Sequence, residues 1–417
     1  MSINLEVPAK FKLIVEQSHQ VAVEIFRANS RKYDLAEHEY PKELDILAAL
    51  LDGMNESGES GTGARGVRRD LDTAGKSDDA AGQANGADRS NQNGGNLSAV
   101  LSIIEACWGD VGLVLSMPRQ GLGNAAIASV ADDEQLMRFD KLWASMAITE
   151  PACGSDSAAI RTTAVLDGDH YVLNGEKIFV TSGARSDAVV VWATLDREAG
   201  RAAIKSFVVE KGTPGMVVER LERKLGIRAS DTATIRFTDC RVPRQNLLGS
   251  PEVNAEQGFA GVMQTFDNTR PLVAGMAIGV GRAALEALRD MLTGEAGLII
   301  DYDLPAHCQP ASVATYLRLE ADLEAAYLLT LEAAWMADNR RPNSLQASMS
   351  KAKAGRVATE VTLRCVELAG SLGYSERNLL EKWARDAKIL DIFEGTQQIQ
   401  QLIVARRILG LSSTELK

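Results

Sequence analysis

The feature that most constrains the fold is the spacing of apolar residues, which changes twice along the chain. Up to about residue 143, apolar residues recur every three or four positions, as in residues 97–105, and this spacing predicts helices. Residues 160–245 instead alternate apolar and polar side chains in short runs, which predicts β-strands. From about residue 255 the helical spacing returns and persists to the end. The chain is therefore expected to be mainly α with a central β domain.

These changes divide the chain into three expected domains. Residues 1–145 form an N-terminal helical domain, residues 146–250 a small antiparallel β-barrel or sandwich, and residues 251–417 a C-terminal four-helix bundle. Turns are expected at Asp167-Gly168-Asp169 and at Asn174-Gly175 inside the sheet region. The expected C-terminal helices span residues 256–292, 309–337, 342–371, 377–387 and 397–409.

One segment interrupts the N-terminal domain. Residues from about 53 to 96 are mostly Gly, Ser, Asp, Asn, Ala and Arg, with almost no large apolar residue apart from Leu71. Such a composition buries too little apolar surface to offset the entropy lost on ordering. We expect a flexible insertion, and the alternative is a binding segment that orders on contact.

The composition argues against several classes of partner. A net charge of −11 disfavours nucleic acid and anionic membranes, and 5 Trp with 7 Tyr are too few for a base-stacking surface. No run of about 18 apolar residues is present to span a bilayer, and residues 1–10 lack the basic-then-apolar order of a signal peptide. We therefore expect a cytoplasmic protein with no nucleic-acid or membrane partner.

The metal-binding residue types do not form a motif. The 5 cysteines are odd in number and far apart, and the 4 histidines do not pair at ligand spacing. We expect reduced thiols and no bound metal.

A carboxylate near the C-terminus has surroundings that suit a catalytic base. Glu394 lies between Phe393 and Gly395, at a predicted turn that opens an amphipathic helix. Desolvation beside Phe393 disfavours the charged form and raises the pKa, so the group could take a weakly acidic C–H proton near neutral pH. A Glu in the first turn of a helix is also favoured by the helix dipole alone. Both interpretations stay open for this residue taken by itself.

The residues around Glu394 resemble a family signature. Phe-Glu-Gly-Thr-x-x-Ile-Gln at 393–400, preceded by Arg-Asp-Ala-Lys-Ile at 385–389, is similar to the C-terminal signature of acyl-CoA dehydrogenases. That family also has the helical, β, helical order of domains. The resemblance implies FAD as cofactor and an acyl-CoA thioester as substrate, oxidised to the trans-2-enoyl-CoA. It further implies that Glu394 removes the α-proton while flavin N5 accepts the hydride.

Two more segments resemble the flavin-binding parts of this family. Thr149 to Asp156 reads Thr-Glu-Pro-Ala-Cys-Gly-Ser-Asp, close to the family's Thr-Glu-Pro-x-x-Gly-Ser-Asp loop, and residues 177–183 resemble the strand that lies against the flavin. Trp is common in the family where this chain has Phe179. The resemblance implies cofactor contacts by Ala147, Ile148, Thr149, Gly154, Ser155, Phe179, Val180, Thr181, Thr396 and Gln398.

The substrate side is implied in the same way. Gln264 to Pro271 resembles the helix segment that lines the acyl-CoA side of the cleft. The implied substrate contacts are Ser155, Asp267, Asn268, Thr269, Arg270 and Gly395. Some relatives carry the catalytic Glu at the position that aligns with Thr269. Since Thr cannot act as that base, the resemblance assigns the role to Glu394.

Two segments depart from the family pattern. Members usually have an Arg that reaches the FAD pyrophosphate of a neighbouring subunit, and the corresponding residues 293–303 contain none. The family's Gln-x-x-Gly-Gly-x-Gly segment, which contributes to the adenine end of that FAD, reads Glu367-Leu-Ala-Gly-Ser-Leu-Gly. A carboxylate facing a pyrophosphate lowers affinity unless other groups compensate.

Three accounts of this departure stay open. The chain forms a hetero-oligomer with a second acyl-CoA dehydrogenase-like chain, or a homo-oligomer in which Arg289 or Lys351 holds the pyrophosphate, or a flavin-poor acyl-CoA-binding interaction module. Survival of the other matching residues on distant segments favours an enzyme. An electron-transfer flavoprotein is the implied electron acceptor, and an acyl-CoA oxidase that uses oxygen is the alternative.

Overall fold

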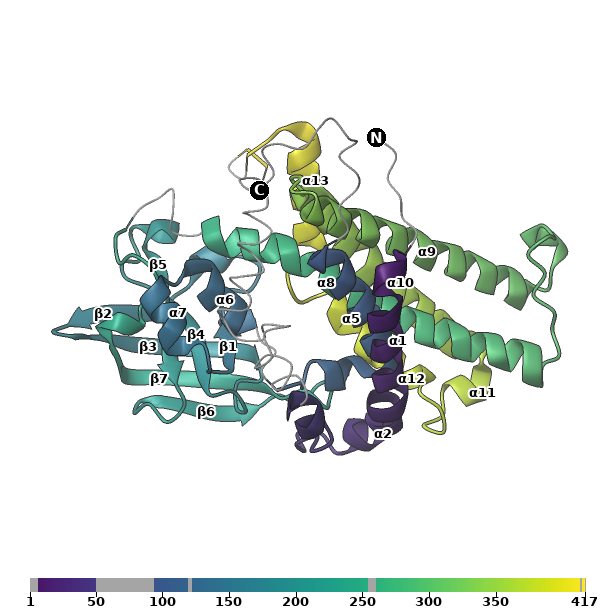
Figure 1. Cartoon of the computed structure of the whole chain (residues 1–417), viewed down its shortest axis with the longest axis horizontal. Helices are drawn as coiled ribbons and strands as arrows, with labels where there is room; N and C mark the ends of the chain where they lie inside the picture. Colours follow the sequence, from purple (N-terminus) through teal and green to yellow (C-terminus); the bar gives the residue numbers. More distant parts are fainter. Residues whose placement is uncertain (1–6, 50–93, 119–121, 254–259, 413–414, 417) are drawn as a thin grey trace.

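The computed structural model describes residues 7–49, 94–118, 122–253, 260–412 and 415–416, and it places the sheet at one end of the molecule and the long helices at the other (Figure 1). The 53–96 insertion expected from the sequence lies almost wholly outside the described residues. Its last positions, Gly95 and Asn96, belong to a helix instead, so helical structure begins two residues earlier than expected.

The helices whose bounds the structure describes before the sheet are short, except for α5. They are α1 (Lys12–Val21), the π-helical turn η2 (Ala22–Arg27), α2 (Ala28–Leu35), α5 (Gly95–Val114), α6 (Leu122–Val130) and α7 (Asp133–Phe139). Helix α7 begins with a capping box, in which the Asp132 side chain accepts a hydrogen bond from the Gln135 backbone N–H and the Gln135 side chain accepts from that of Asp132.

The helices after the sheet are longer. They are α8 (Ala260–Asp290), the π-helical turn η6 (Met291–Glu295), α9 (Ala311–Asp338), α10 (Ser344–Leu368), α11 (Gly370–Gly373), α12 (Leu380–Leu390) and α13 (Gln397–Leu409). All the C-terminal helices expected from apolar spacing are present. The differences are at the ends: the expected helix 342–371 ends at Leu368 and is followed by α11, and 377–387 becomes Leu380–Leu390.

Seven strands form one sheet in the middle of the sequence. They are β1 (Ala144–Ala147), β2 (Thr163–Asp167), β3 (His170–Thr181), β4 (Ala188–Thr194), β5 (Ile204–Glu210), β6 (Met216–Leu221) and β7 (Thr232–Pro243). Their order is β1-β4-β2-β3-β7-β6, with β5 paired to β4. The expected turn at residues 167–169 joins β2 to β3.

The sheet differs from the sequence-based expectation in two ways. It is mixed, not wholly antiparallel, because β4 pairs in parallel with β1 and with the first residue of β2. The expected turn at Asn174-Gly175 is instead a register shift inside the continuous strand β3. A Cβ at Gly175 would lie 2.4 Å from Thr162 Oγ1, so this Gly permits a close approach of two backbones and marks a bulge.

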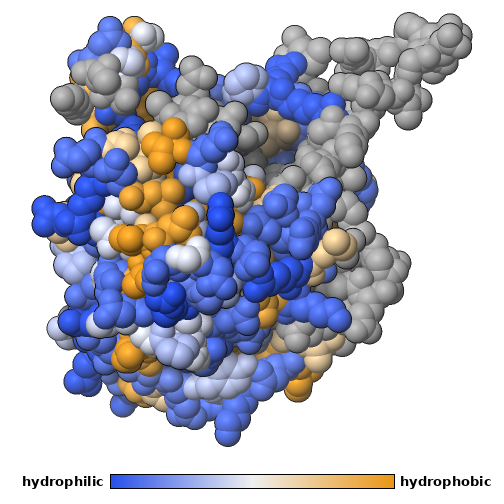
Figure 2. All heavy atoms as spheres, turned by 90° about the vertical axis from the view of Figure 1, so that its left-hand side faces the viewer, coloured by the Kyte–Doolittle hydropathy of each residue, from blue (hydrophilic) through white to orange (hydrophobic). Residues whose placement is uncertain are grey.

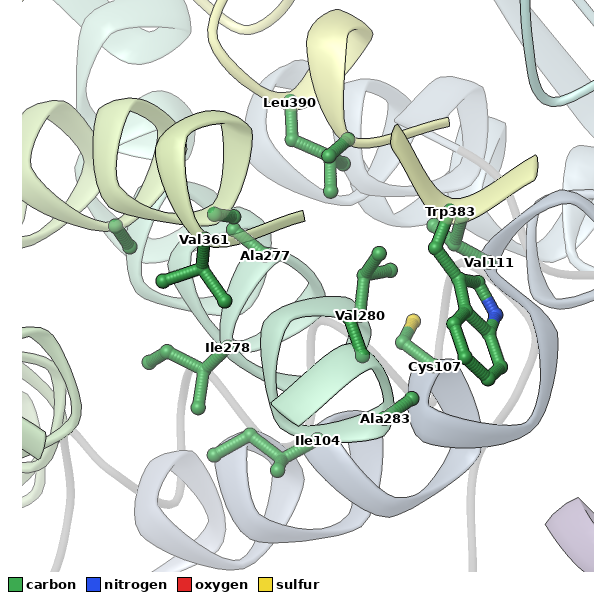
Figure 3. Packing of buried hydrophobic residues seen from close by; sticks show 14 of the residues in the cluster. Ile104, Cys107, Val111, Ala277, Ile278, Val280, Ala283, Val361, Trp383 and Leu390 are labelled. Carbon is green, nitrogen blue, oxygen red and sulfur yellow. The ribbon is translucent and has the colours of Figure 1, made fainter. Parts of the chain in front are cut away.

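The largest core lies between α5, α8, α10 and α12. Ile104, Cys107 and Val111 of α5 lie close to Val280 and Ala283 of α8, with Trp383 of α12 beside Cys107 and Leu390 of α12 above them (Figure 3). The helices approach closely because α8 carries small residues, and a Cβ at Gly279 would lie 2.3 Å from the Ile104 carbonyl oxygen.

Two of these core helices are apolar enough to be compared with membrane spans. Residues Gly95–Val114 and Thr269–Gly294 pass the test of length and hydropathy, but 67% and 72% of the tested windows are buried inside the fold. Such burial is typical of core helices.

The sheet end of the molecule shows apolar patches among mostly hydrophilic side chains (Figure 2), and Val165, Leu166 and Val217 are exposed on the sheet.

A buried group of three charged side chains connects α5, α12, α2 and the loop before β7. Lys382 of α12 lies between Asp110 of α5, at 2.6 Å, and Asp386, at 2.5 Å, and all three side chains are buried. Asp386 also accepts from the backbone N–H of Ile227, in the loop before β7, and Asp110 accepts from Ser30 of α2. Burial opposes a charged Lys382, but the two carboxylates raise its pKa above the usual range.

Replacing Lys382 with Met tests how far the fold depends on this group. The change leaves Asp110 and Asp386 buried without their counter-ion, so we expect the free energy of unfolding to fall by about 3–5 kcal/mol. Urea unfolding measures the change, and Lys12→Met, at an exposed lysine of α1, should stay within about 0.5 kcal/mol of the unsubstituted protein. Equal stability of the two variants would contradict the assignment.

Candidate active site

Glu394 lies on a turn between α12 and α13 whose backbone is strained. Its φ is +56° and that of Gly395 is +90°, both in the left-handed region. A non-glycine residue there costs roughly 1–2 kcal/mol, and such conformations cluster at functional sites. Thr396 then caps α13, because its side chain accepts a hydrogen bond from the backbone N–H of Ile399.

The carboxylate of Glu394 reaches across to α8. Thr269 Oγ1 donates to Glu394 Oε2 at 3.0 Å, and the next residue, Arg270, is buried. Burial raises the pKa of Glu394, although the Thr269 hydrogen bond and the charges of Arg270 and Lys351 act in the opposite direction. The direction agrees with the sequence-based expectation, and the two positions at which relatives carry the base are in contact here.

Two side chains hold the peptide oxygens of this turn. Lys351 Nζ of α10 donates to the Gly395 carbonyl oxygen at 2.7 Å, and Gln400 Nε2 donates to those of Glu394 and Gly395 at 3.1 and 3.2 Å. The suggestion that Lys351 holds a pyrophosphate is wrong. Its side chain is buried, and its ammonium group is bonded to the Gly395 carbonyl oxygen inside the protein. Arg289 is exposed and donates to Asp290, and its role stays a prediction.

On the sheet side, the loop after β1 is fixed to β3. The Ile178 N–H donates to the Thr149 carbonyl oxygen at 2.9 Å, and Lys177 Nζ donates to Ile148 O at 2.9 Å and Glu150 Oε1 at 2.7 Å. Glu150 also accepts from the backbone N–H and the hydroxyl of Thr162. Burial would raise the pKa of Glu150, but Lys177 and these hydrogen bonds hold it below its usual value.

Sequence reasoning missed the pairing of Glu150 with Lys177. The available signal was the alternation along β3, where Tyr171, Leu173 and Lys177 share the buried face. A lysine on that face requires a buried carboxylate nearby.

Phe179 is the exposed aromatic residue on this side of the site. It has a φ of +57° at a register shift in β3, and its side chain is 61% exposed. The shift turns the ring away from the sheet core, in which the neighbouring Val180 is buried. An exposed ring, one residue after the Ile178 that is bonded to Thr149, offers a flat apolar surface for another ring to lie against.

The remaining predicted site residues fall into four groups. Ala147 and Val180 have buried side chains, so any cofactor contact is left to their backbone. Ile148, Thr181 and Thr396 are half-buried, whereas Gly154, Ser155 and Gln398 are exposed. Asp267 and Asn268 lie in α8, but their side chains lie outside the described part of the chain.

Helix α6 relates the two sides of the site. It packs against β1, which leads into the Thr149 loop, and against α8, which carries Thr269. A Cβ at Gly123 of α6 would lie 2.4 Å from the carbonyl oxygens of Ala144 and Ser145, so this contact requires Gly.

Within the described ranges, no three His, Cys, Asp or Glu side chains form a group that could hold a metal ion.

Comparison with known proteins decides the family. The acyl-CoA dehydrogenase middle domain matches residues 145–240 and the acyl-CoA dehydrogenase C-terminal domain matches residues 256–409. The short-chain specific acyl-CoA dehydrogenase of Clostridium acetobutylicum is 33% identical over 332 residues, which cover 75% of this chain and 81% of that protein. The chain belongs to the acyl-CoA dehydrogenase family.

Other acyl-CoA dehydrogenases show the same relationship. The mitochondrial short-chain specific enzyme of Rattus norvegicus is 37% identical over 270 residues, which cover 63% of this chain and 62% of that enzyme. The match thus spans less than two thirds of that relative. Butyryl-CoA dehydrogenase from Megasphaera elsdenii has a TM-score of 0.77 at 26% identity, with 98% of this chain and 100% of that chain covered. These matches confirm the fold class.

FAD is the cofactor that membership of the acyl-CoA dehydrogenase family brings. The exposed ring of Phe179 follows Ile178, which is bonded to the Thr149 loop, and it fits the flavin end of this molecule. In the two segments that depart from the family pattern, residues 291–295 form η6, and Glu367 pairs with Arg364 at 2.5 Å. That pairing reduces the repulsion that Glu367 would exert on a phosphate.

The Glu150–Lys177 pair generates a pH prediction. The pKa of Glu150 lies below its ordinary value of 4.5 in the folded protein, so its stabilising contribution is complete above pH 4.5 and is lost as the pH falls through the folded pKa. We expect Glu150→Gln to lower the free energy of unfolding by about 3 kcal/mol at neutral pH. The difference from the unsubstituted protein should shrink below pH 4.5.

Urea unfolding at a series of pH values measures this difference. Glu198→Gln, at an exposed glutamate of the same domain, is the matched control and should show no such dependence. A constant difference across the series would contradict the role given to Glu150.

Proposed function

We propose that this chain catalyses the FAD-dependent α,β-dehydrogenation of an acyl-CoA thioester to the trans-2-enoyl-CoA. The observation that carries the proposal is the Glu394 carboxylate, half-buried on a strained turn, with its pKa raised and Thr269 hydrogen-bonded to it. Membership of the acyl-CoA dehydrogenase family supports the same reaction.

Glu394 takes the α-proton of the thioester in this proposal. A base works best when its pKa lies near the working pH, and burial moves the pKa of Glu394 in that direction. The Thr269 hydroxyl orients the carboxylate by its hydrogen bond to Oε2. The enolate-like charge that develops on the thioester oxygen requires hydrogen-bond donors, and the backbone N–H of Glu394 is the one that we propose from this chain.

Thr149, Ser155, Phe179 and Thr181 would hold the flavin, with Thr396 and Gln398 contributing from the turn and the start of α13. Bound FAD supplies the acceptor for the β-hydride. Fixing the Thr149 loop through Lys177 keeps this side of the site in place before any ligand binds. Ser155 and Gly395, with Asp267 to Arg270, are the proposed contacts to the acyl-CoA.

A short acyl-CoA is the substrate that we propose, because the relatives from Rattus norvegicus and Clostridium acetobutylicum are named short-chain specific and the one from Megasphaera elsdenii is a butyryl-CoA dehydrogenase. An electron-transfer flavoprotein is the proposed acceptor, and a cytoplasmic location stays a prediction. Rapid reoxidation of the reduced protein by oxygen would favour an oxidase instead.

Glu394→Gln tests the base directly. Gln has nearly the same size but cannot accept the proton, so we expect the rate of oxidation of butyryl-CoA to fall by at least about a hundredfold while butyryl-CoA binding is retained. In the unsubstituted enzyme, kcat should fall as the pH drops, with a midpoint above the ordinary Glu value of 4.5. Glu360→Gln, at an exposed glutamate of α10, is the control. Unchanged turnover in Glu394→Gln would refute the assignment.

A second candidate function is that of a subunit that needs a partner chain to retain FAD. The missing Arg in residues 293–303 and the burial of Lys351 favour it, because both remove donors for a pyrophosphate. In this case the complex contains a second acyl-CoA dehydrogenase-like chain.

The visible spectrum of the purified chain distinguishes these candidates. The second candidate predicts less than one FAD per chain in the protein alone, and more after a second acyl-CoA dehydrogenase-like chain is added. One FAD per chain without a partner would instead support a homo-oligomer that uses other donors. A chain that never binds FAD would support the acyl-CoA-binding module.

A further inference from the structure

Lys351 is a buried charged group that the proposed reaction does not use. Its side chain is 1% exposed on α10, and its Nζ donates to a peptide oxygen, that of Gly395. Burying an ammonium group costs free energy unless it makes strong interactions. The position is therefore informative: this lysine lies against the one turn that carries the base.

The turn requires such support. Glu394 and Gly395 both have positive φ, and a backbone in this region persists only when its surroundings hold it. Gln400 donates to the carbonyl oxygens of both residues, and Lys351 donates to the second of them. Gln400 belongs to α13, next to the turn in sequence, whereas Lys351 belongs to a different helix of the bundle. Thr269 of α8 bonds only the Glu394 side chain, so Lys351 is the group that fixes the backbone of the turn to another helix among the hydrogen bonds described here.

We propose that Lys351 is a positioning residue for Glu394: its ammonium group holds the Glu394–Gly395 turn against α10 and so fixes where the carboxylate lies. That Glu394 acts as a base rests on the proposed dehydrogenation. The hold on the turn concerns its geometry and applies to any reaction at this site.

The charges around Lys351 agree with this role. Burial lowers the pKa of Lys351 to about 8, Asp391 and Glu394 act to raise it, and Arg270 of α8 acts to lower it further. In return, the charge of Lys351 draws the pKa of Glu394 down against the effect of burial. Removing this charge should therefore move the pKa of Glu394 upward.

Three variants of the full-length protein separate position from charge. Lys351→Met removes the donor and the charge, and Lys351→Gln removes the charge but keeps an N–H donor and is the milder change should Met disturb folding. Lys353→Met is the matched control, since Lys353 lies on the same helix but pairs with Asp322 at 2.8 Å on the other side. Circular dichroism checks the fold of each variant.

Hydrogen exchange followed by mass spectrometry measures how firmly the turn is held, and it does not depend on activity. We expect the amides of a peptide spanning residues 391–402 to exchange roughly fivefold to tenfold faster in Lys351→Met, because a buried hydrogen bond is lost. Lys353→Met should leave that peptide unchanged. If the exchange of the two variants is the same, Lys351 does not hold the turn and the proposal is overturned.

The rate at which butyryl-CoA bleaches the flavin in a single turnover measures how well Glu394 acts as the base. We expect Lys351→Met to react about tenfold to a hundredfold more slowly, as misplacement of a catalytic group does. The acidic limb of its pH profile should move upward by about one unit, and Lys351→Gln should show the same movement. Faster exchange with an unchanged rate and profile would overturn the proposal, because Lys351 would then be only structural.

Failure of the proposed function gives a different result. If the unsubstituted protein with FAD is not bleached by butyryl-CoA or by longer acyl-CoA thioesters, the dehydrogenation is refuted. The exchange comparison still decides whether Lys351 holds the turn.

Discussion

Lys382, with almost no access to water, lies between Asp110 and Asp386, and the arrangement of the helical part depends on this contact. Four elements far apart in sequence contribute to it: α5 delivers Asp110, α12 delivers Lys382 and Asp386, α2 delivers the Ser30 hydroxyl, and the loop before β7 delivers the backbone N–H of Ile227. Because charges buried in protein tolerate little misplacement, the contact fixes where α12 lies. The turn that carries Glu394 starts directly after α12, so it inherits that position.

Both sides of the candidate site use one device. A buried lysine donates to a peptide oxygen of a loop, Lys177 to Ile148 and Lys351 to Gly395, and a residue with positive φ lies close by in sequence to each contact. The residue with positive φ is the exposed Phe179 on one side and the half-buried Glu394 on the other. On the Glu394 side, the Lys351 ammonium group is bonded directly to the strained turn, so the protein itself supports this conformation.

Sequence periodicity predicted the order of elements and nearly all the long helices, because helix and strand spacings reflect which faces are buried. It did not predict β1, a four-residue strand too short to show a period, or the register shift at Gly175, where the backbone lies too close to Thr162 for any side chain. Glu394 and Thr269 were found through motif resemblance. The roles of Lys177 and Lys351 depend on contacts between distant segments, and a single sequence shows no such contacts.

The position of the site depends on how closely α8 packs against the core at Gly279. At this residue α8 lies directly against the Ile104 carbonyl oxygen, so α8 cannot approach α5 more closely, and no larger side chain fits there. Thr269 lies ten residues earlier on the same helix, roughly 15 Å along its axis. Any change in the angle at which α8 crosses α5 at Gly279 is therefore amplified at Thr269. A tilt of a few degrees at Gly279 would move the Thr269 hydroxyl away from the Glu394 carboxylate.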